Sequence, residues 1–124
     1  MEVVAVIGAS SDTSRYAYKA MEMLEEYGHK PVPVHPREEN VRGHKVIHNL
    51  GELATQKIDT ITVYVNPVIS DKYEKDMIAV KPKRVIFNPG AENPKLSKAL
   101  EANGIEVENA CTLVLLRTGQ YERE

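Results

Sequence analysis

The sequence of 124 residues contains a single cysteine, no tryptophan and one phenylalanine. The lone Cys111 excludes an internal disulfide and a zinc site built from several cysteines. There is no signal-peptide pattern and no apolar run of about 18 residues, so we expect a cytoplasmic protein with no membrane partner. Sixteen basic and 18 acidic residues are mixed along the chain without a polybasic run, so we expect no nucleic-acid partner.

The remaining composition is that of an ordinary globular protein, with 42% hydrophobic and 27% charged residues. A chain of this length suits one domain with one proper core. The sequence has no internal repeat, low-complexity stretch or linker-like segment. We therefore expect a single domain over residues 1–124.

Strand-like and helix-like segments alternate along the chain, which is typical of a parallel sheet covered by helices on both faces. The two prolines in the second strand-like segment, Pro31 and Pro33, predict a strand at the sheet edge. The pattern predicts an α/β, Rossmann-like three-layer sandwich with a parallel sheet of about five strands. The expected strands span residues 3–7, 30–35, 59–65, 84–87 and 105–107, and the expected helices begin near residues 14, 67, 94 and 113.

The first strand runs directly into a glycine and a group of small hydroxyl residues, Gly8 to Arg15, ahead of the first helix. The first amides of such a helix lack intrahelical partners and point over the end of the strand, where an anion such as phosphate fits. Only the first glycine of the dinucleotide pattern G-x-G-x-x-G is present, and the triphosphate-binding pattern G-x-x-x-x-G-K-[ST] is absent. The turn therefore predicts a phosphate site without selecting its ligand.

Four strand ends carry residues suited to a shared site: Gly8–Arg15, His35–Arg37, Val65–Pro67 and Asn88–Gly90. In an open parallel sheet, ligands bind outside the carboxyl ends of the strands, where the strand order reverses. Each loop alone could be simple turn and cap chemistry, which any α/β protein needs. Four such loops at one edge favour a single crevice.

The end of the second strand narrows the choice of ligand. Proteins that bind an unphosphorylated dinucleotide usually place an acidic residue there to accept hydrogen bonds from the ribose. This chain has His35, Pro36 and Arg37, and an arginine suits a ribose that carries its own phosphate, as in coenzyme A (CoA) or NADP. An alternative interpretation, equally open, is that Arg37 is a solvated loop charge beside Glu38 and Glu39.

Four segments in order, Val6–Ser10, Val32–Pro36, Val65–Pro67 and Asn109–Cys111, resemble the small CoA-binding domain proteins. That family is similar to the N-terminal CoA-binding domain of the succinyl-CoA synthetase alpha subunit. The resemblance covers nearly the whole chain. It implies a CoA-binding module that holds CoA, or an acyl-CoA, across the strand ends, while the ligase chemistry of the synthetase is not carried over.

By this resemblance, the turn after the first strand would contact the phosphates, the loop after the second would border the adenosine, and Val65–Pro67 would form a wall against the nucleotide. The complete set of expected ligand-binding residues is Gly8, Ala9, Ser10, Ser11, Ser14, Arg15, His35, Pro36, Arg37, Val65, Asn66, Pro67, Asn88, Pro89, Gly90, Asn109 and Cys111.

No catalytic group and no metal site are assigned from the sequence. His44 and His48 have ligand-like spacing, but Gly43 and the β-branched residues between them disfavour a helix. Cys111 is either a small buried hydrophobe, which is commoner, or a reactive thiol. Two alternatives stay open: a small NADP-type oxidoreductase or acyl-handling enzyme that uses Cys111, and a regulatory or interaction protein whose segment 113–116 docks a second copy or a partner protein.

Overall fold

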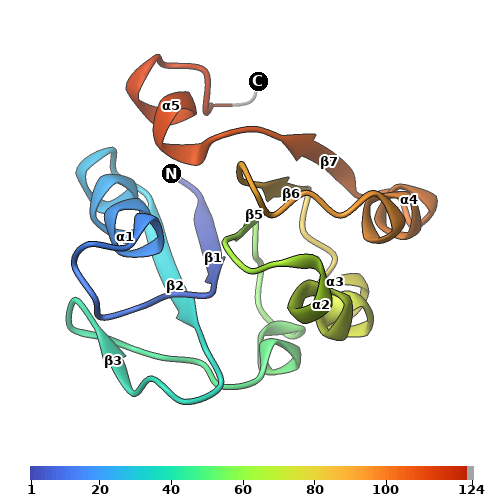
Figure 1. Cartoon of the computed structure of the whole chain (residues 1–124), viewed down its shortest axis with the longest axis horizontal. Helices are drawn as coiled ribbons and strands as arrows, with labels where there is room; N and C mark the ends of the chain where they lie inside the picture. The colour runs from blue at the N-terminus through green and yellow to red at the C-terminus, as the bar shows by residue number, and fades with distance from the viewer. Residues whose placement is uncertain (123–124) are drawn as a thin grey trace.

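The computed structural model describes residues 1–122, which form a five-stranded parallel sheet between two layers of helices (Figure 1). The predicted Rossmann-like three-layer fold is confirmed. None of the helices in these residues is long and apolar enough to cross a membrane. The sheet contains β1 (Val3–Ile7), β2 (Lys30–Val34), β5 (Thr60–Val63), β6 (Arg84–Phe87) and β7 (Glu106–Asn109). The helices are α1 (Tyr16–Glu26), α2 (Pro67–Ser70), α3 (Glu74–Val80), α4 (Pro94–Ala102) and α5 (Thr112–Arg117), with 3₁₀ turns η1 (Leu50–Leu53) and η2 (Asp71–Tyr73).

The strand order is β2-β1-β5-β6-β7, so the chain moves outward from β1 to β2 and then crosses back to β5 on the other side of β1. The order therefore reverses between β1 and β5. Ile7, the last residue of β1, pairs with Val34 on one side and Val63 on the other, so these strands end level with one another. The loops that follow them gather at one edge, at the place where ligands bind in open α/β sheets.

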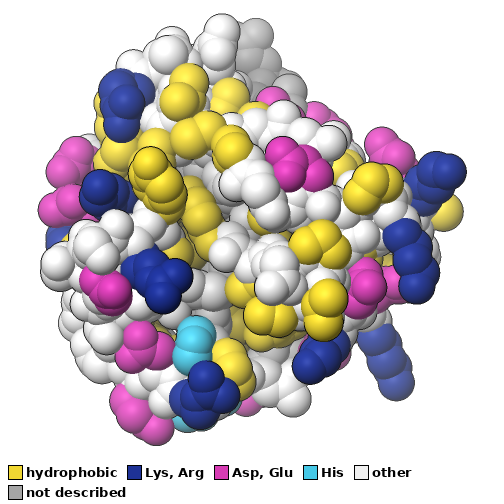
Figure 2. Space-filling model, in the orientation of Figure 1, with side chains coloured by type: hydrophobic (Ala, Val, Ile, Leu, Met, Phe, Trp, Pro, Cys, Tyr) yellow, Lys and Arg dark blue, Asp and Glu magenta, His cyan; other side chains and the backbone are white. Residues whose placement is uncertain are grey.

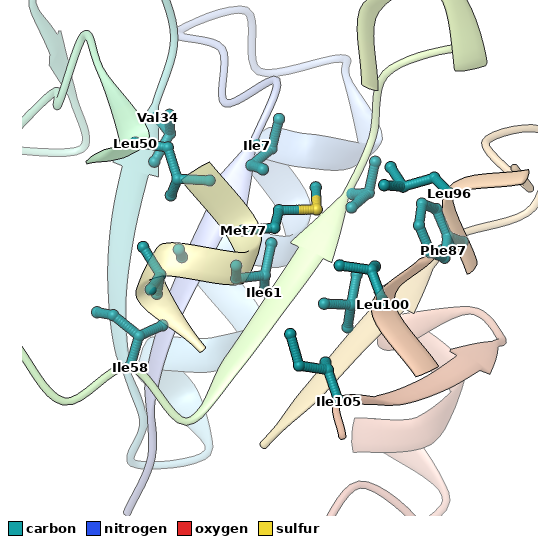
Figure 3. Close-up of a cluster of buried hydrophobic side chains, with 14 of the residues drawn as sticks. Ile7, Val34, Leu50, Ile58, Ile61, Met77, Phe87, Leu96, Leu100 and Ile105 are labelled. Atoms are coloured by element: carbon teal, nitrogen blue, oxygen red, sulfur yellow. The ribbon is translucent and has the colours of Figure 1, made fainter. Parts of the chain in front are cut away.

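Apolar side chains fill the space on both faces of the sheet. On one face, Ile61 and Phe87 pack toward Met77 of α3 and toward Leu96 and Leu100 of α4 (Figure 3). The opposite face packs against α1 and α5, with Met21, Leu24 and Leu116 among the buried residues. The central strands β5 and β6 are buried along their whole length, as their apolar and β-branched composition predicts.

The expected helix starts and the edge strand are confirmed. Asn66 and Asn93 each accept a hydrogen bond from the amide three residues later, at 3.1 Å, and each precedes a proline at the first helical position. β2, with its two prolines, lies at the sheet edge.

The helix expected after Asn66 is wrong as a continuous element, because it is divided into α2, η2 and α3. The break is held from a distant segment: the Asn93 side-chain amide donates to Ser70 Oγ at 2.9 Å and to Asp71 Oδ1 at 2.8 Å. As a result, Ile69 is 40% exposed at the strand-end edge and does not join Met77 in the core.

The segment between β2 and η1 contains a short antiparallel hairpin, β3 (Asn40–Val41) and β4 (His44–Lys45). Its turn places Arg42 and Gly43 at positive φ, of 51° and 81°, as in a type I′ turn. Arg42 holds the hairpin against α1 by bonding Glu25 and the Tyr18 hydroxyl. This contact offsets the strain of a non-glycine residue in the left-handed region.

Candidate ligand-binding site

Three cavities lie side by side along the carboxyl ends of the strands. The first cavity, of about 520 Å³, lies over the ends of β1, β5 and β6. The second, of about 560 Å³, lies between the loop after β2 and the η2–α3 segment. The third, of about 340 Å³, lies between the start of α1 and α5. The first cavity shares Gly8, His35, Val65 and Ile69 with the second, and Tyr16, Tyr64, Asn88 and Pro89 with the third.

Thirteen of the 17 predicted ligand-binding residues line these cavities, and their role in binding stays a prediction. All four strand-end loops contribute, so the structure brings together the edge that the sequence singles out. The lining residues are Gly8, Ala9, Ser10, Arg15, His35, Val65, Asn66, Asn88, Pro89 and Gly90 in the first cavity, Pro36 and Arg37 in the second, and Cys111 in the third.

Gly8 ends β1 with a φ of +88°, a conformation that L side chains rarely adopt. A Cβ atom at this position would lie 2.8 Å from Val65 Cγ1. The amides of Gly8 and Ala9 both donate to the carbonyl of Val34, at 3.1 and 3.3 Å. The glycine thus lets the first turn lie close against the end of β5 and forms the floor of the first cavity.

The start of α1 offers unpaired amides to the first cavity. Ser10, Tyr16 and Ala17 line this cavity, and their backbone N–H groups donate to no acceptor within residues 1–122. The helix has no side-chain cap and no acidic residue in its first turn. Because free amides and the positive end of an 11-residue helix both favour negative charge, the first cavity suits a phosphate group.

Ser11 and Ser14 lie outside the cavities and bond carboxylates of the protein instead. The Ser11 amide and hydroxyl donate to Glu38, at 2.9 and 3.1 Å, and these bonds hold the pKa of the Glu38 carboxyl below its usual value. The Ser14 amide and hydroxyl donate to Asp12 Oδ1, at 3.0 and 2.7 Å, and lower the pKa of Asp12 in the same way. Nothing in the local sequence pairs Ser11 with Glu38, which lies 27 residues away.

His35 lines both the first and the second cavity. Its Nδ1 accepts two hydrogen bonds, from the backbone amides of Arg37 and Glu38, each at 3.0 Å. Nδ1 must be unprotonated to accept them, so the neutral ring carries its proton on Nε2. Burial lowers the pKa of His35 below its ordinary value; the negative charge of Glu38 opposes this shift, and the positive charge of Arg37 adds to it.

This lowered pKa predicts a pH dependence of stability. The folded protein binds a proton at His35 less readily than the unfolded chain, so His35 is destabilising only when it is protonated. The contribution of neutral His35 to the free energy of unfolding is fully present above the ordinary pKa of 6.5. It is lost as the pH falls through the lower pKa of the folded state. We expect an NMR titration of His35 to have its midpoint below 6.5. Between pH 7 and 5, urea denaturation should show a smaller loss of unfolding free energy in His35→Gln than in the wild type. Equal losses would show that protonation of His35 does not cause the loss.

Two basic residues from different segments line the second cavity. Arg37 lies in the loop after β2 and Lys72 in η2, and neither forms an ion pair within the described part of the chain. Asp76 of α3 also lines this cavity. Lys72 was missed by the sequence analysis because it follows no strand directly and reaches the site only through the break after α2.

Two asparagines of the first cavity differ in what they can offer a ligand. Asn66 uses its Oδ1 to cap α2, which leaves its NH₂ group at the cavity wall. Asn88 is 2% exposed and uses both ends of its amide, donating to Thr62 and to the Val63 carbonyl and accepting from the Thr112 amide. Asn88 therefore positions the wall, whereas Asn66 can hydrogen-bond a ligand.

Two further predicted residues, Pro67 and Asn109, lie outside the cavities. Pro67 is the first residue of α2, and Asn109 is exposed at the end of β7. Both occupy the strand-end edge that the sequence indicates, but their side chains line none of the three cavities.

The third cavity is bounded by Tyr16, Tyr64 and Cys111 together with Leu113 and Val114 of α5. Cys111 is half-buried and immediately precedes α5. The Tyr64 hydroxyl is buried without a hydrogen-bond partner in the described residues, and burial raises the pKa of this phenol. Within residues 1–122, no three His, Cys, Asp or Glu side chains are grouped so that they could hold a metal ion.

Comparison with known proteins gives a match to one family. The sequence model of the family described as CoA binding domain matches residues 2–117. A crystal structure of an uncharacterized protein shares 40% identity, with a TM-score of 0.90, and the match covers 97% of this chain and 98% of that chain. A hypothetical protein from Pyrococcus horikoshii OT3 shares 28% identity over 93% of this chain and 81% of that chain, with a TM-score of 0.87. No curated protein matches the chain.

A larger protein contains the same fold. The dinucleotide forming acetyl-coenzyme A synthetase 1 of Ca. Korarchaeum cryptofilum, in complex with phosphate and ADP, shares 21% identity and a TM-score of 0.74. The match covers 88% of this chain but 25% of that chain. At this identity the likeness concerns the fold alone.

Proposed function

The chain belongs to the CoA binding domain family, and from this premise we propose that residues 1–124 act as one module that binds CoA across the ends of its strands. The observation that carries the proposal is the first cavity, at the point of strand-order reversal, which is lined by three residues with unpaired backbone amides, Ser10, Tyr16 and Ala17. These amides suit the diphosphate of the ligand. The second cavity, with Arg37 and Lys72, suits the adenosine end and its 3′-phosphate.

The role of Arg37 leads to a prediction with dephospho-CoA, which lacks only the 3′-phosphate. Charge-assisted hydrogen bonds contribute about 1.5–3 kcal/mol, and Arg37 is exposed, so we use the lower end of that range. Calorimetry should show that Arg37→Gln weakens the binding of CoA by about tenfold and leaves dephospho-CoA almost unaffected. Equal losses for the two ligands would remove Arg37 from the 3′-phosphate site.

Arg15→Gln is the matched comparison, because Arg15 lines the first cavity, on the side proposed for the diphosphate. It should weaken CoA and dephospho-CoA by the same factor. The nicotinamide dinucleotides complete the test. NADP binding tighter than CoA would favour the dinucleotide alternative at the same cleft, and no affinity for CoA in any form would overturn the proposal.

A further inference from the structure

The third cavity has a chemical character different from that of its neighbours. Its walls are mainly apolar, formed by Tyr16, Tyr64, Leu113 and Val114, and two of these large side chains lie open to solvent, Tyr16 at 69% and Val114 at 47% exposure. On the face shown in Figure 2, hydrophobic side chains form a band between α5 and the start of α1. A cavity lined by apolar side chains favours an apolar ligand group.

The position of the third cavity indicates which ligand carries this apolar group. The three cavities follow one another in the order second, first, third, and the third shares Tyr16 and Tyr64 with the first. CoA has the same linear order, from the 3′-phosphorylated adenosine through the diphosphate to the pantetheine arm and its terminal sulfur. A ligand with its diphosphate at the start of α1 and its adenosine near Arg37 would direct that arm toward α5.

The size of the third cavity exceeds what a free thiol would fill. Its volume is about 340 Å³, more than twice that of an apolar cavity of about 150 Å³ that holds benzene. A thiol would leave most of the apolar wall in contact with water. An alkyl chain on the sulfur would cover this wall and gain the free energy of burying its methylenes.

We propose that the third cavity receives the acyl group of an acyl-CoA, an uncharged alkyl chain of a few carbons, so that the physiological ligand is a CoA thioester. This inference rests on the proposed function, since the cavity is assigned by its continuity with the CoA site. The family resemblance implies CoA or an acyl-CoA, and the apolar walls contributed by α5 favour the thioester.

The test is the dependence of affinity on chain length in the full-length protein. Calorimetry with CoA and with acetyl-, butyryl-, hexanoyl- and octanoyl-CoA should give an affinity that rises about threefold to fourfold per added methylene until the cavity is full. A flat series, with CoA bound as tightly as its thioesters, would overturn this inference and leave the proposed function intact. Absence of binding for every member of the series would overturn both.

Two variants separate the cavity from general surface hydrophobicity. Val114→Asp places a charge in the third cavity and should abolish the gain per methylene, and Val114 is exposed enough for the fold to tolerate it. Val68→Asp is the matched control, because Val68 is 73% exposed and lines none of the three cavities. If Val68→Asp also abolishes the gain, or Val114→Asp keeps it, the acyl chain lies elsewhere.

Cys111 supplies an independent readout, because it is the single cysteine of the chain and lines the third cavity. Alkylation of Cys111 by iodoacetamide should be slowed by saturating hexanoyl-CoA more than by saturating CoA. Equal protection by the two ligands would contradict acyl occupancy of this cavity. Succinyl-CoA tests the exposed Arg117 at its rim: tighter binding of succinyl-CoA than of butyryl-CoA would overturn the assignment to an uncharged chain.

Discussion

Replacing Gly8 with alanine is expected to destabilise the fold by about 2–4 kcal/mol and to weaken the binding of CoA on the order of tenfold or more. The first contribution is conformational, since Gly8 has a φ of +88°. The second is steric, since the new Cβ would lie 2.8 Å from Val65 Cγ1. Relief of this clash must shift the first turn or the Val65 side chain, and both Gly8 and Val65 line the first cavity. Urea denaturation and calorimetry with CoA would measure the two effects.

Gly28→Ala separates the two contributions. Gly28 ends α1 with a φ of +84°, and a Cβ there would meet no atom within 4 Å. This variant should lose only the conformational part of the stability, about 1–2 kcal/mol, and should bind CoA like the wild type. Adding Val65→Ala to Gly8→Ala should restore part of the lost stability by removing the clash. Gly8→Ala with the stability and affinity of Gly28→Ala would contradict the close approach at Val65.

The parts of the fold that follow from local sequence were predicted correctly. The buried strands are short runs of apolar and β-branched residues, and the two Asn-Pro pairs begin α2 and α4 because asparagine caps free amides and proline suits the first helical position. Parallel topology then brings the carboxyl ends together, which is why most of the predicted site residues line one set of cavities.

The parts that depend on distant contacts could not be predicted. The break between α2 and α3 is held by Asn93, 22 residues after Asp71. The family resemblance implies a phosphate contact for Ser11, whereas its amide and hydroxyl donate to Glu38 in this structure. Tyr121, after the last helix, is 1% exposed and stacks under the Arg84 guanidinium, 4.5 Å from the ring centroid. No sequence period marks any of these pairs.

The same distinction explains what was missed in the site. Lys72 and Tyr16 belong to helical segments that flank the strand ends, and only the packing of those segments brings them to the cavities. Asn88 shows the opposite case, a residue that lines the cavities at a predicted strand end but whose amide is fully used inside the protein. A residue type suited to binding therefore indicates a ligand contact only where its polar atoms are left unpaired.

Replacing Asn88 with aspartate is expected to destabilise the protein by about 3 kcal/mol at pH 7. The substitution removes the NH₂ group that donates to Thr62 Oγ1 at 2.7 Å and to the Val63 carbonyl at 2.9 Å. It places a buried carboxylate against that carbonyl, and burial raises the pKa of the introduced carboxyl. Asn88 Oδ1 also accepts the Thr112 amide at the start of α5, and an aspartate oxygen can keep that bond, so the loss concerns the two donated hydrogen bonds.

The pH dependence distinguishes this explanation from a simple loss of packing. With a raised pKa in the folded state, the introduced carboxyl is least destabilising below the ordinary value of about 3.9, where it is protonated in both states and can donate to Val63. The difference from the wild type should grow as the pH rises through the raised pKa, measured by urea denaturation at pH 4 and pH 7. Asn103→Asp is the matched control, because Asn103 also donates to a carbonyl, that of Ala99 at 2.8 Å, but in an exposed position. It should lose about 1 kcal/mol or less, with little pH dependence. Equal effects of the two variants would contradict the explanation by burial of the Asn88 side chain.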